Sequence, residues 1–379
     1  MKIRSKILVA LSGGVDSAVA ASILKKQGHE VVGAFFHFFG PSKMGKTDQN
    51  RNSAMLIAKK LGIPLKIVDA RKEFKKKVIN YFVDEYKNGR TPNPCVVCNK
   101  EMKFRLLFDL MKKEKADAVA TGHYARLRRE ILNPKYEILN KFKIQNSKFK
   151  IVYHLQQASD KTKDQSYFLY RLTQKDLAKI IFPLGNHKKS EVKKLAGKMK
   201  LPTLEEESQD ICFLLGQDIS SYLGKCIKTR KGNIIDSAGK VLGKHKGLPF
   251  YTLGQRKGIK IGPPSPRLWR ARGTGPYFVV GKNLRRNELV VTNDPEKLLT
   301  RKFFVSGVNW VSVRPKFPLR ARVQTRYRAG KFSAIIREVR SGKLEVRSEK
   351  YLRAVTAGQS AVFYKNGEVL GGGIINHAN

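Results

Sequence analysis

The stretch Ile7-Leu8-Val9-Ala10-Leu11-Ser12-Gly13-Gly14-Val15-Asp16-Ser17 passes from a short apolar run into a glycine turn, and a helical pattern follows over Ala18 to Lys26. This order predicts a strand, a tight loop and a helix. Gly13 and Gly14 let backbone amides approach a phosphate group closely, and the positive end of the helix favours negative charge. The stretch therefore predicts a phosphate-binding loop at the carboxyl end of a strand.

The polar side chains of this loop fit the same ligand. Ser12 and Ser17 add hydroxyl donors, and Asp16 lies where a carboxylate can hold Mg²⁺ against the phosphates. An ordinary strand-to-helix turn, with Asp16 or Ser17 as its N-cap, is the alternative. The loop has no lysine, unlike a Walker A loop. It resembles the pyrophosphatase loop (PP-loop) of enzymes that split ATP into AMP and pyrophosphate, and such enzymes adenylate an oxygen atom so that a nucleophile can displace it.

Up to about Leu204, short apolar runs alternate with segments of helical periodicity. The expected strands are Ile7 to Leu11, Val31 to Phe39, Leu65 to Val68 and Ala118 to Thr121. The expected helices are Ala18 to Lys26, Asn50 to Leu61, Lys72 to Tyr86 and Lys103 to Lys113. This alternation predicts an α/β fold with a doubly wound parallel sheet, Rossmann-like, that binds ligands at the carboxyl ends of its strands.

The later parts of the chain have a different texture. The polar segment Arg128 to Lys163 predicts a hairpin-like excursion, and beyond Glu205-Glu206-Glu207 glycine and proline become frequent while long helices disappear. Short strands then recur with turns between them, over Ala321 to Tyr327, Phe332 to Val339, Lys343 to Val346, Ser360 to Tyr364 and Val369 to Ile375. We expect three domains: 1–206 with the nucleotide loop, a small central domain 207–298, and a C-terminal antiparallel β-barrel or sandwich, 299–379.

The chain is strongly basic. Its 379 residues include 76 Lys and Arg against 30 Asp and Glu, a formal net charge of +46. Sixteen basic residues and one acid, Asp236, fall between Ile219 and Asn287, and sixteen with four acids fall between Arg301 and Asn379. Such a surface attracts polyanions and gains free energy from counterion release on nucleic acid. A generally lysine-rich proteome would also make the chain basic, but the arginine content of these stretches favours phosphate contacts.

No segment approaches the length of about 20 apolar residues that a membrane span needs, and the basic N-terminus lacks a secretory signal pattern. Four cysteines are too few for a disulfide scaffold in a chain of this length. We therefore expect a cytoplasmic protein whose cysteines are catalytic, metal-binding or simply buried.

Two cysteines form a Cys-x-x-Cys pair in Thr91-Pro92-Asn93-Pro94-Cys95-Val96-Val97-Cys98-Asn99-Lys100. If a helix starts near Lys103, its dipole together with Lys100 and Lys103 should lower a thiol pKa, which suits a nucleophile. Half of a zinc site is the other interpretation, although Cys212 and Cys226 are not a second close pair. Cys226 has no motif around it and is expected to be structural.

Seven segments occur together in one order: Ser12 to Ser17, Thr91 to Lys100 with Lys103-Phe104, Ala120 to Tyr124, Lys163 to Leu169, Cys212-Phe213, Tyr251 to Gly258 and Gly358 to Val362. With these segments the chain closely resembles the bacterial tRNA-specific 2-thiouridylases, or tRNA-uridine 2-sulfurtransferases, over nearly its whole length.

The resemblance implies a reaction. ATP, with Mg²⁺, adenylates the 2-oxygen of the wobble uridine of tRNA, and sulfur from a cysteine persulfide then replaces that oxygen, with release of AMP and pyrophosphate. Cys212 would carry the persulfide. Cys98 would be the partner nucleophile and would form a transient disulfide with Cys212. A sulfur-relay protein or a cysteine desulfurase would supply the sulfur, and the protein would act as a monomer.

The resemblance also assigns ligand contacts. For ATP it implies Ala10, Leu11, Ser12, Gly13, Gly14, Val15, Asp16, Ser17, Phe36 and Gly122, with Asp16 as the candidate ligand of the Mg²⁺ that accompanies ATP and with no other metal ligand. For the anticodon arm of tRNA it implies Asn93, Pro94, Cys95, His123, Lys163, Asp164, Gln165, Arg326, Tyr327 and Gln359, and it makes 207–298 a basic tRNA-binding domain. Many relatives carry Asp where this chain has Cys95, which leaves the role of Cys95 open.

Three other functions compete with this one. Gly40 to Thr47 matches the Walker A expression after an apolar run, which would suit a P-loop NTPase. A different PP-loop synthetase or amidotransferase would adenylate a carboxylate or a purine carbonyl, but it would leave the charge of +46 unexplained. A tRNA-binding module with an inactive nucleotide fold would retain tRNA without forming AMP.

Overall fold

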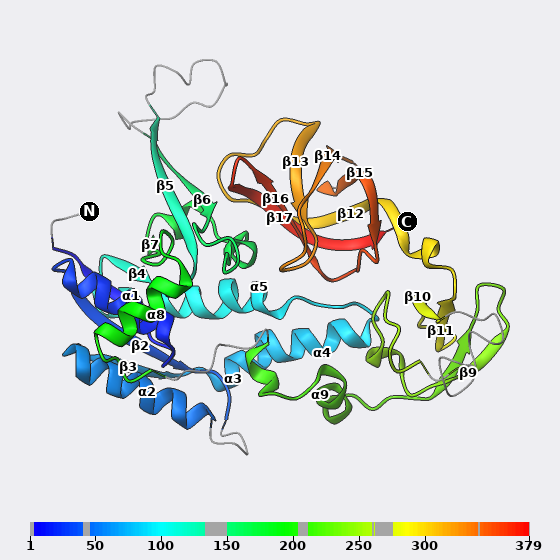
Figure 1. Ribbon diagram of the computed structural model, residues 1–379, viewed down its shortest axis with the longest axis horizontal. Coiled ribbons are helices and arrows are strands. Elements are labelled where there is room, and N and C mark those ends of the chain that lie inside the picture. The colour runs from blue at the N-terminus through cyan, green and yellow to red at the C-terminus, as the bar shows by residue number, and fades with distance from the viewer. Residues whose placement is uncertain are drawn as a thin grey trace.

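The N-terminal part of the molecule is built on a five-stranded parallel sheet (Figure 1). The computed structural model describes residues 4–40, 46–132, 150–203, 211–259, 261, 276–339 and 342–378. The strands are β1 (Lys6–Ala10), β2 (Glu30–His37), β3 (Leu65–Asp69), β4 (Ala118–Ala120) and β7 (Ile180–Ile181), in the order β3-β2-β1-β4-β7. The order changes direction between β1 and β4, and the carboxyl ends of these strands are where such sheets bind ligands.

Helices cover both faces of this sheet. They are α1 (Val15–Lys26), α2 (Lys46–Leu61), α6 (Arg105–Lys113) and α8 (Lys189–Lys198). Ile7 and Val9 of β1 pack with Ala18 and Ile57 of α1 and α2, whereas Leu8 packs with residues of α6 on the other face. Because side chains alternate along a strand, one apolar strand feeds two cores. The expected doubly wound architecture is confirmed.

Beside the sheet lie two longer helical spans, each of which contains one π-helical segment. One consists of α3 (Arg71–Phe74), η1 (Lys75–Ile79) and α4 (Asn80–Lys87). The other consists of α5 (Pro94–Cys98), η2 (Asn99–Phe104) and α6. A helix starting near Lys103 was expected, and this is wrong. Asn93 caps the helix and Pro94 occupies its first turn, so the helix already begins at Pro94.

The segment after β4 is a hairpin, as the sequence predicts. Strands β5 (Ala125–Leu132) and β6 (Lys150–Gln157) pair along their full length, and the residues between them lie outside the described part. Short helices η5 (Ser166–Leu169) and α7 (Gln174–Leu177) follow. The hairpin joins the C-terminal sheet through β17, where Gln156 pairs with Glu368.

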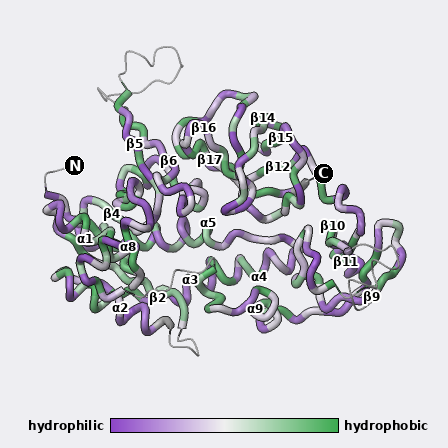
Figure 2. The backbone as a smooth tube through the Cα atoms, viewed as in Figure 1, coloured by the Kyte–Doolittle hydropathy of each residue, from purple (hydrophilic) through white to green (hydrophobic). Residues whose placement is uncertain are grey.

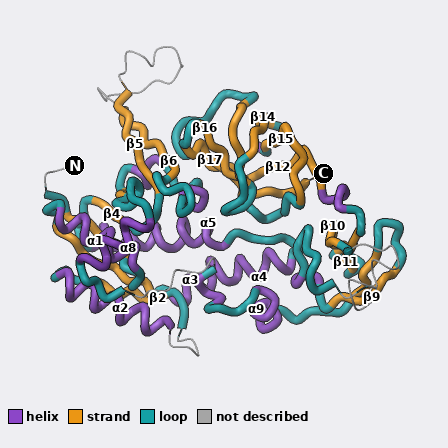
Figure 3. Tube along the Cα trace, viewed as in Figure 1, coloured by secondary structure: helices purple, strands orange, loops and turns teal. Residues whose placement is uncertain are grey.

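A small four-stranded sheet with the order β10-β11-β8-β9 forms the central part. Its strands are β8 (Gly232–Ile235), β9 (Val241–His245), β10 (Phe278–Asn283) and β11 (Glu288–Thr292), preceded by η6 (Cys212–Leu214) and α9 (Ile219–Cys226), with η7 (Leu248–Phe250) and η8 (Pro295–Leu298) nearby. Figure 3 shows how the helices concentrate in the N-terminal part while strands dominate the rest.

The C-terminal part is a closed antiparallel barrel, which confirms the barrel expectation over the sandwich. Its six strands follow the order β12-β15-β14-β13-β16-β17, and β17 pairs back with β12. They are β12 (Leu299–Trp310), β13 (Leu319–Gln324), β14 (Phe332–Glu338), β15 (Leu344–Arg353), β16 (Ser360–Lys365) and β17 (Glu368–Ala378). Burial alternates along β13 and β14, and hydrophobic and hydrophilic residues change along the strands in the same way (Figure 2).

Candidate active site

A cavity of about 280 Å³ lies where the carboxyl end of the parallel sheet meets the start of α5, the segment before η6 and the turn after β13. Its polar lining residues are Ser12, Asp16, Cys95, Cys98, Asn99, Lys103, His123, Tyr124, Lys163, Gln165, Lys189, Lys193, Cys212, Tyr327 and Arg328. The cavity thus brings the nucleotide loop, both cysteine segments and part of the barrel to one place.

The loop after β1 has the shape of an anion cradle. Gly13 has a φ of +85°, and a Cβ there would lie 2.4 Å from the carbonyl oxygen of Asn50, so only glycine fits. The Ser17 hydroxyl donates to the Gly14 carbonyl at 3.0 Å and accepts from the Ser12 amide at 3.1 Å. The Ser17 hydroxyl thus holds the loop in shape, and its expected contact with phosphate stays a prediction.

Asp16 forms the charged centre of the loop. Lys189 Nζ donates to both of its carboxylate oxygens, at 2.7 and 2.8 Å, and the Tyr124 hydroxyl donates to Oδ1 at 2.8 Å. Sequence reasoning missed Lys189 because it stands far along the chain, at the start of α8, and belongs to no motif. Tyr124 was part of a motif, Thr121 to Tyr124, but was given no role.

Gly122 lies directly behind the loop. A Cβ on Gly122 would be 2.8 Å from the backbone of Asp16 and of Ser17, so glycine permits the two loops to touch. Of the other residues implied for ATP, Leu11 is buried in the core, and Phe36 stacks on Phe38 with ring centroids 6.0 Å apart. Ser12, Gly14, Val15 and Asp16 line the cavity, whereas Ala10, Leu11, Phe36 and Gly122 are not part of its lining.

These residues fit a magnesium–nucleotide ligand. The loop needs glycine at position 13, where a Cβ would clash with the backbone. The first turn of α1 carries the Asp16 carboxylate, an oxygen ligand of the type that Mg²⁺ prefers. Asp16 would hold the ion, and the loop amides would face the phosphates.

The start of α5 carries Asn93, Pro94 and Cys95 into the site. Pro94 and Cys95 line the cavity, but the Asn93 side chain accepts from the Val96 amide and caps the helix. The Gln359 side-chain amide donates to the carbonyls of Thr91 and Pro92, at 2.9 and 3.1 Å, so that it holds the segment leading into α5. Its expected contact with tRNA stays a prediction.

Cys98 and Cys212 meet in the cavity. Cys98 is buried in an apolar cluster with Phe74 and Phe213, the neighbour of Cys212, whereas Cys212 is exposed. Burial raises the pKa of Cys98 to about 12, against which Lys103 acts to lower it. Although Cys212 as a whole residue is exposed, desolvation also raises the pKa of its thiol.

The expected lowering of the Cys98 pKa is therefore wrong for this state of the protein. Cys98 ends α5 in the middle of a continuous helical span rather than standing at a helix N-terminus. Lys100, the second cation invoked, pairs with Asp176 at 2.5 Å. Lys103 alone faces the thiols, and it does not offset their desolvation.

All four cysteines are free thiols, and each lies in the described part of the chain. The transient disulfide between Cys98 and Cys212 is thus not formed in this structure. Among the described residues, no group of three His, Cys, Asp or Glu side chains is arranged to hold a metal ion. Cys226, expected to be structural, is exposed at the end of α9.

His123 lines the cavity as a neutral side chain. Its Nδ1 lies 2.8 Å from the Thr121 hydroxyl, and its ring stacks on Phe104 at 5.9 Å. Burial, assisted by Lys103, lowers the pKa of His123 to about 3. It therefore offers a hydrogen bond or a ring face to a ligand at neutral pH, not a positive charge.

The loop from Lys163 to Gln165 closes one wall. Lys163 and Gln165 line the cavity, and Gln165 pairs with the backbone of Tyr124 in both directions, at 2.8 and 3.0 Å. Asp164 accepts four hydrogen bonds, from Gln157, Ala158 and Ser166, and so organises its own loop.

The turn after β13 adds the barrel's contribution. Tyr327 packs on Phe168 with centroids 4.4 Å apart and lines the cavity. Arg326 is exposed, whereas Arg328, which was given no role from the sequence, lines this cavity and a neighbouring groove of about 610 Å³. Lys189, Lys193, Lys103 and Arg328 are thus the basic lining residues that the resemblance did not name.

Comparison with known proteins bears on this arrangement. The chain matches three family models in succession: tRNA methyl transferase HUP domain over residues 5–216, tRNA methyl transferase PRC-barrel domain over 220–293, and aminomethyltransferase beta-barrel domain over 300–375. It is 38% identical to the tRNA-specific 2-thiouridylase MnmA of Coxiella burnetii, with 98% of each chain covered. The chain belongs to the tRNA-specific 2-thiouridylase family.

Other 2-thiouridylases match equally well. The relative from Chromobacterium violaceum is 39% identical over 98% of this chain and 92% of its own, and that from Geobacter metallireducens is 38% identical over 100% and 98%. The match therefore includes the loop, both cysteine segments and the barrel.

The Walker A-like range Gly40 to Thr47 falls mostly outside the described residues, which leave out 41–45. Within the described part of this 2-thiouridylase family member, no helix is both long and apolar enough to cross a membrane.

Proposed function

We propose that the protein catalyses ATP-dependent 2-thiolation of the wobble uridine of tRNA. One observation carries the proposal: the nucleotide loop at Ser12 to Asp16 and the two cysteines Cys98 and Cys212 line one cavity. Adenylation and sulfur transfer must act on the same carbon of one base, so the two sets of groups have to lie together. Membership of the 2-thiouridylase family supports the same reaction.

The loop side of the cavity would bind the nucleotide. ATP with Mg²⁺ supplies the adenylyl group that converts the uridine 2-oxygen into a leaving group. Asp16 would hold the metal, the amides around Gly13 and Gly14 would face the phosphates, and pyrophosphate would leave from this side. His123, neutral at physiological pH, would contact the base without adding charge.

The cysteine side would deliver sulfur. Cys212 is exposed, so a sulfur-relay protein or cysteine desulfurase can load it with a persulfide, whereas Cys98 is buried beneath it. The Cys98 thiolate would then form a bond to Cys212 Sγ while the bond to the outer sulfur breaks. The released hydrosulfide attacks C2 of the uridine, AMP departs with the oxygen, and a dithiol reductant, itself oxidised to a disulfide, reduces the Cys98–Cys212 disulfide back to two thiols.

The raised pKa of Cys98 fits a thiol that reacts only in the assembled complex. A permanently ionised thiolate would be open to oxidation or alkylation before tRNA arrives. Lys103, the cation that acts on both thiols, is the group that would stabilise the thiolate when it forms.

The anticodon arm would enter from the side of the barrel. Pro94, Cys95, Lys163, Gln165 and Tyr327 line the cavity mouth and fit a base turned out of its stack. Four further residues that do not line this cavity stay candidates for contact with tRNA: Asn93, Asp164, Arg326 and Gln359. We retain the limits 1–206, 207–298 and 299–379 for the nucleotide, central tRNA-binding and barrel domains, and the cytoplasmic location and monomeric state remain predictions.

Mass analysis of nucleosides tests the proposal. Unmodified tRNA incubated with the protein, ATP and a persulfide donor should gain 2-thiouridine. Cys212→Ser should abolish the thionucleoside yet leave AMP transfer to tRNA detectable, Cys98→Ser should behave alike, and Cys226→Ser should match the unaltered protein.

Two results would overturn it. Pyrophosphate release stimulated by a small carboxylate and not by tRNA would indicate another PP-loop synthetase. Retention of tRNA with no AMP formed under any condition would indicate a binding module.

A further inference from the structure

The loop after β1 lacks the lysine that Walker A loops use to contact phosphates, yet a lysine reaches it from elsewhere. Lys189 Nζ lies 2.7 and 2.8 Å from the two carboxylate oxygens of Asp16. Its side chain is 13% exposed, and it lies 5.9 Å above the Tyr124 ring. A largely buried ammonium is thus fixed beside the position where the phosphates of a nucleotide are expected.

The packing of α8 on α1 places Lys189 beside the nucleotide loop. Lys189 is the first residue of α8, a ten-residue helix that packs against α1, the helix of the nucleotide loop. The Asp160 carboxylate accepts a hydrogen bond from the Lys189 backbone amide at 2.9 Å, which anchors the start of the helix. The Lys189 side chain lines the cavity. Lys193 stands one turn further along and lines the same cavity.

A carboxylate cannot hold a lysine and a divalent ion with the same oxygens. In the free protein Asp16 holds Lys189, which neutralises both charges. A bound triphosphate presents several negative charges to the ammonium, and the accompanying Mg²⁺ competes for the carboxylate. The flexible four-carbon stem of lysine allows the ammonium to change partners.

We propose that Lys189 is a phosphate-binding residue of the ATP site, stored on Asp16 in the free protein and transferred to the phosphate chain when nucleotide binds. It takes the place of the lysine that the loop itself lacks. The inference rests on the proposed use of ATP and adds to it a residue, a ligand group and an exchange of partners.

Calorimetric titration with pyrophosphate and with ATP tests the transfer. In Lys189→Met we expect the affinity for both ligands to fall at least tenfold, with partial recovery in Lys189→Arg. Lys194→Met, which removes an exposed lysine from the same helix, should stay within twofold of the unaltered protein. Equal affinities for Lys189→Met and the unaltered protein would overturn the proposal.

A second variant keeps the test sound if Lys189→Met does not fold. Asp16→Asn releases the stored ammonium, so without Mg²⁺ it should bind pyrophosphate several-fold more tightly than the unaltered protein. Unchanged or weaker binding there would refute the storage on Asp16. Failure of the unaltered protein to bind ATP at all would instead refute the proposed function.

Discussion

Desolvation raises the pKa of both Cys98 and Cys212, and Cys98 is the one that lies buried within an apolar cluster. Lys103 opposes this desolvation, yet the pKa of Cys98 still rises to about 12. A nucleophile of this kind depends on its substrate complex for activation. Under the proposed function, this arrangement would protect the pair between turnovers and would link sulfur release to the presence of tRNA.

Alkylation measures the state of Cys98 directly. With iodoacetamide at pH 7, Cys98 should react at least about a hundredfold more slowly than exposed Cys226, and its rate should rise about tenfold per pH unit up to pH 10. Lys103→Met should slow it further, because the pKa rises again. Mass spectrometry of the labelled peptides gives both rates, and a Cys98 rate that levels off near pH 7 would contradict the burial argument.

Gly122 offers a second residue test. Gly122→Ala places a Cβ against the backbone of Asp16 and Ser17, so the loop must shift. We expect ATP affinity to fall at least tenfold and the free energy of unfolding to fall by about 1–3 kcal/mol. Gly197→Ala on α8, where a Cβ meets nothing within 4 Å, should bind ATP normally in the same titration.

At this scale the sequence singled out the loop and the two cysteines that line the cavity but not their surroundings. Gly13 and Asp16 belong to a contiguous pattern, which local reasoning can find. Lys189 belongs to no pattern and acquires its role only when α8 packs on α1. The Cys98 pKa was mispredicted because its sign depends on burial, which short spacing does not reveal.

The segment that leads into α5 is the element on which the site depends most. The barrel and the central part both grip it: Thr91 N donates to the Ala357 carbonyl, Gln359 donates to Thr91 and Pro92, and Lys282 Nζ donates to the Gly89 carbonyl at 3.1 Å. The position of Cys98 is therefore set by all three parts of the chain.

Gln359→Met tests whether Gln359 positions α5 or contacts tRNA. The change keeps the length of the side chain but removes both hydrogen bonds. We expect thionucleoside formation to fall about tenfold or more, because a small displacement of a reacting group lowers the rate strongly. The affinity for tRNA should stay within twofold. Loss of tRNA affinity in a filter-binding assay would instead support the direct contact that the resemblance implies.

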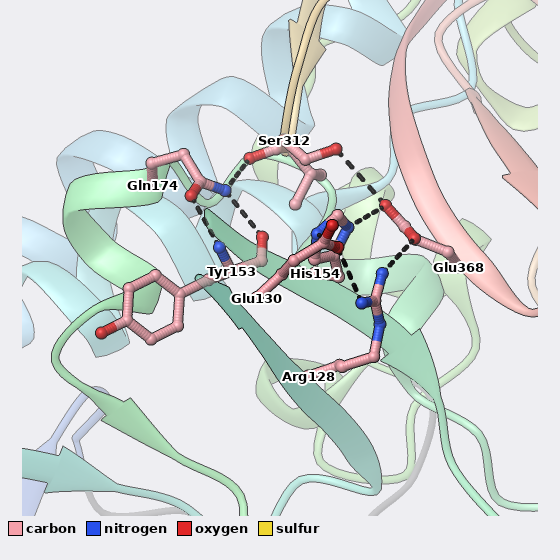
Figure 4. A network of polar contacts seen from close by, with 8 residues as sticks. Arg128, Glu130, Tyr153, His154, Gln174, Ser312 and Glu368 are labelled. Carbon is pink, nitrogen blue, oxygen red and sulfur yellow. Dashed lines mark hydrogen bonds and ion pairs between the residues drawn. The ribbon is translucent and has the colours of Figure 1, made fainter. Parts of the chain in front are cut away.

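The β5–β6 hairpin is fastened to the barrel by a polar network (Figure 4). His154 Nδ1 lies 2.7 Å and Nε2 2.9 Å from carboxylate oxygens of Glu368 and Glu130, and Arg128 lies 2.7 Å from Glu130. Ser312 donates to Glu368 at 3.3 Å. Glu368 of β17 thus connects two elements that no local sequence pattern would join.

Removal of Glu368 should loosen this junction. Glu368→Ala leaves His154 and Arg128 without one carboxylate in a partly buried place, so the free energy of unfolding should fall by about 1–3 kcal/mol. Denaturant titration measures the loss. Glu349→Ala on the exposed side of β15 should change it by less than about 0.5 kcal/mol, and a similar loss there would mean that the network adds nothing specific.

Element types were more predictable than element limits. Short apolar runs that alternate with helical segments predicted the parallel sheet, and short strands with turns between them predicted the barrel. The start of α5 was placed too late even though Asn93-Pro94 is a helix-start signal. The π-helical turns η1 and η2 have no comparable signal in the sequence.

Over the whole molecule, the site forms at the junction of a nucleotide-binding sheet and a closed barrel. Neither the convergence of Cys98 and Cys212 nor the place of Arg328 follows from local periodicity, because segments far apart in the chain are brought together by packing. The net charge of +46 acts at this scale too. A basic surface attracts the whole tRNA molecule. Under the proposed function, the few basic side chains in the cavity would fix the orientation of the anticodon loop.

Salt dependence separates these two contributions. The logarithm of tRNA affinity should fall linearly with the logarithm of salt concentration, because bound phosphates release counterions. Arg328→Ala removes a cation that lines both the cavity and the adjoining groove, so we expect weaker binding and a slope smaller by about one. Arg337→Ala, exposed on β14 away from both, should keep the slope of the unaltered protein. Equal slopes for all three proteins in filter-binding assays would mean that Arg328 does not meet a phosphate, and the barrel turn would then guide the base through Tyr327 and not the backbone through its arginine.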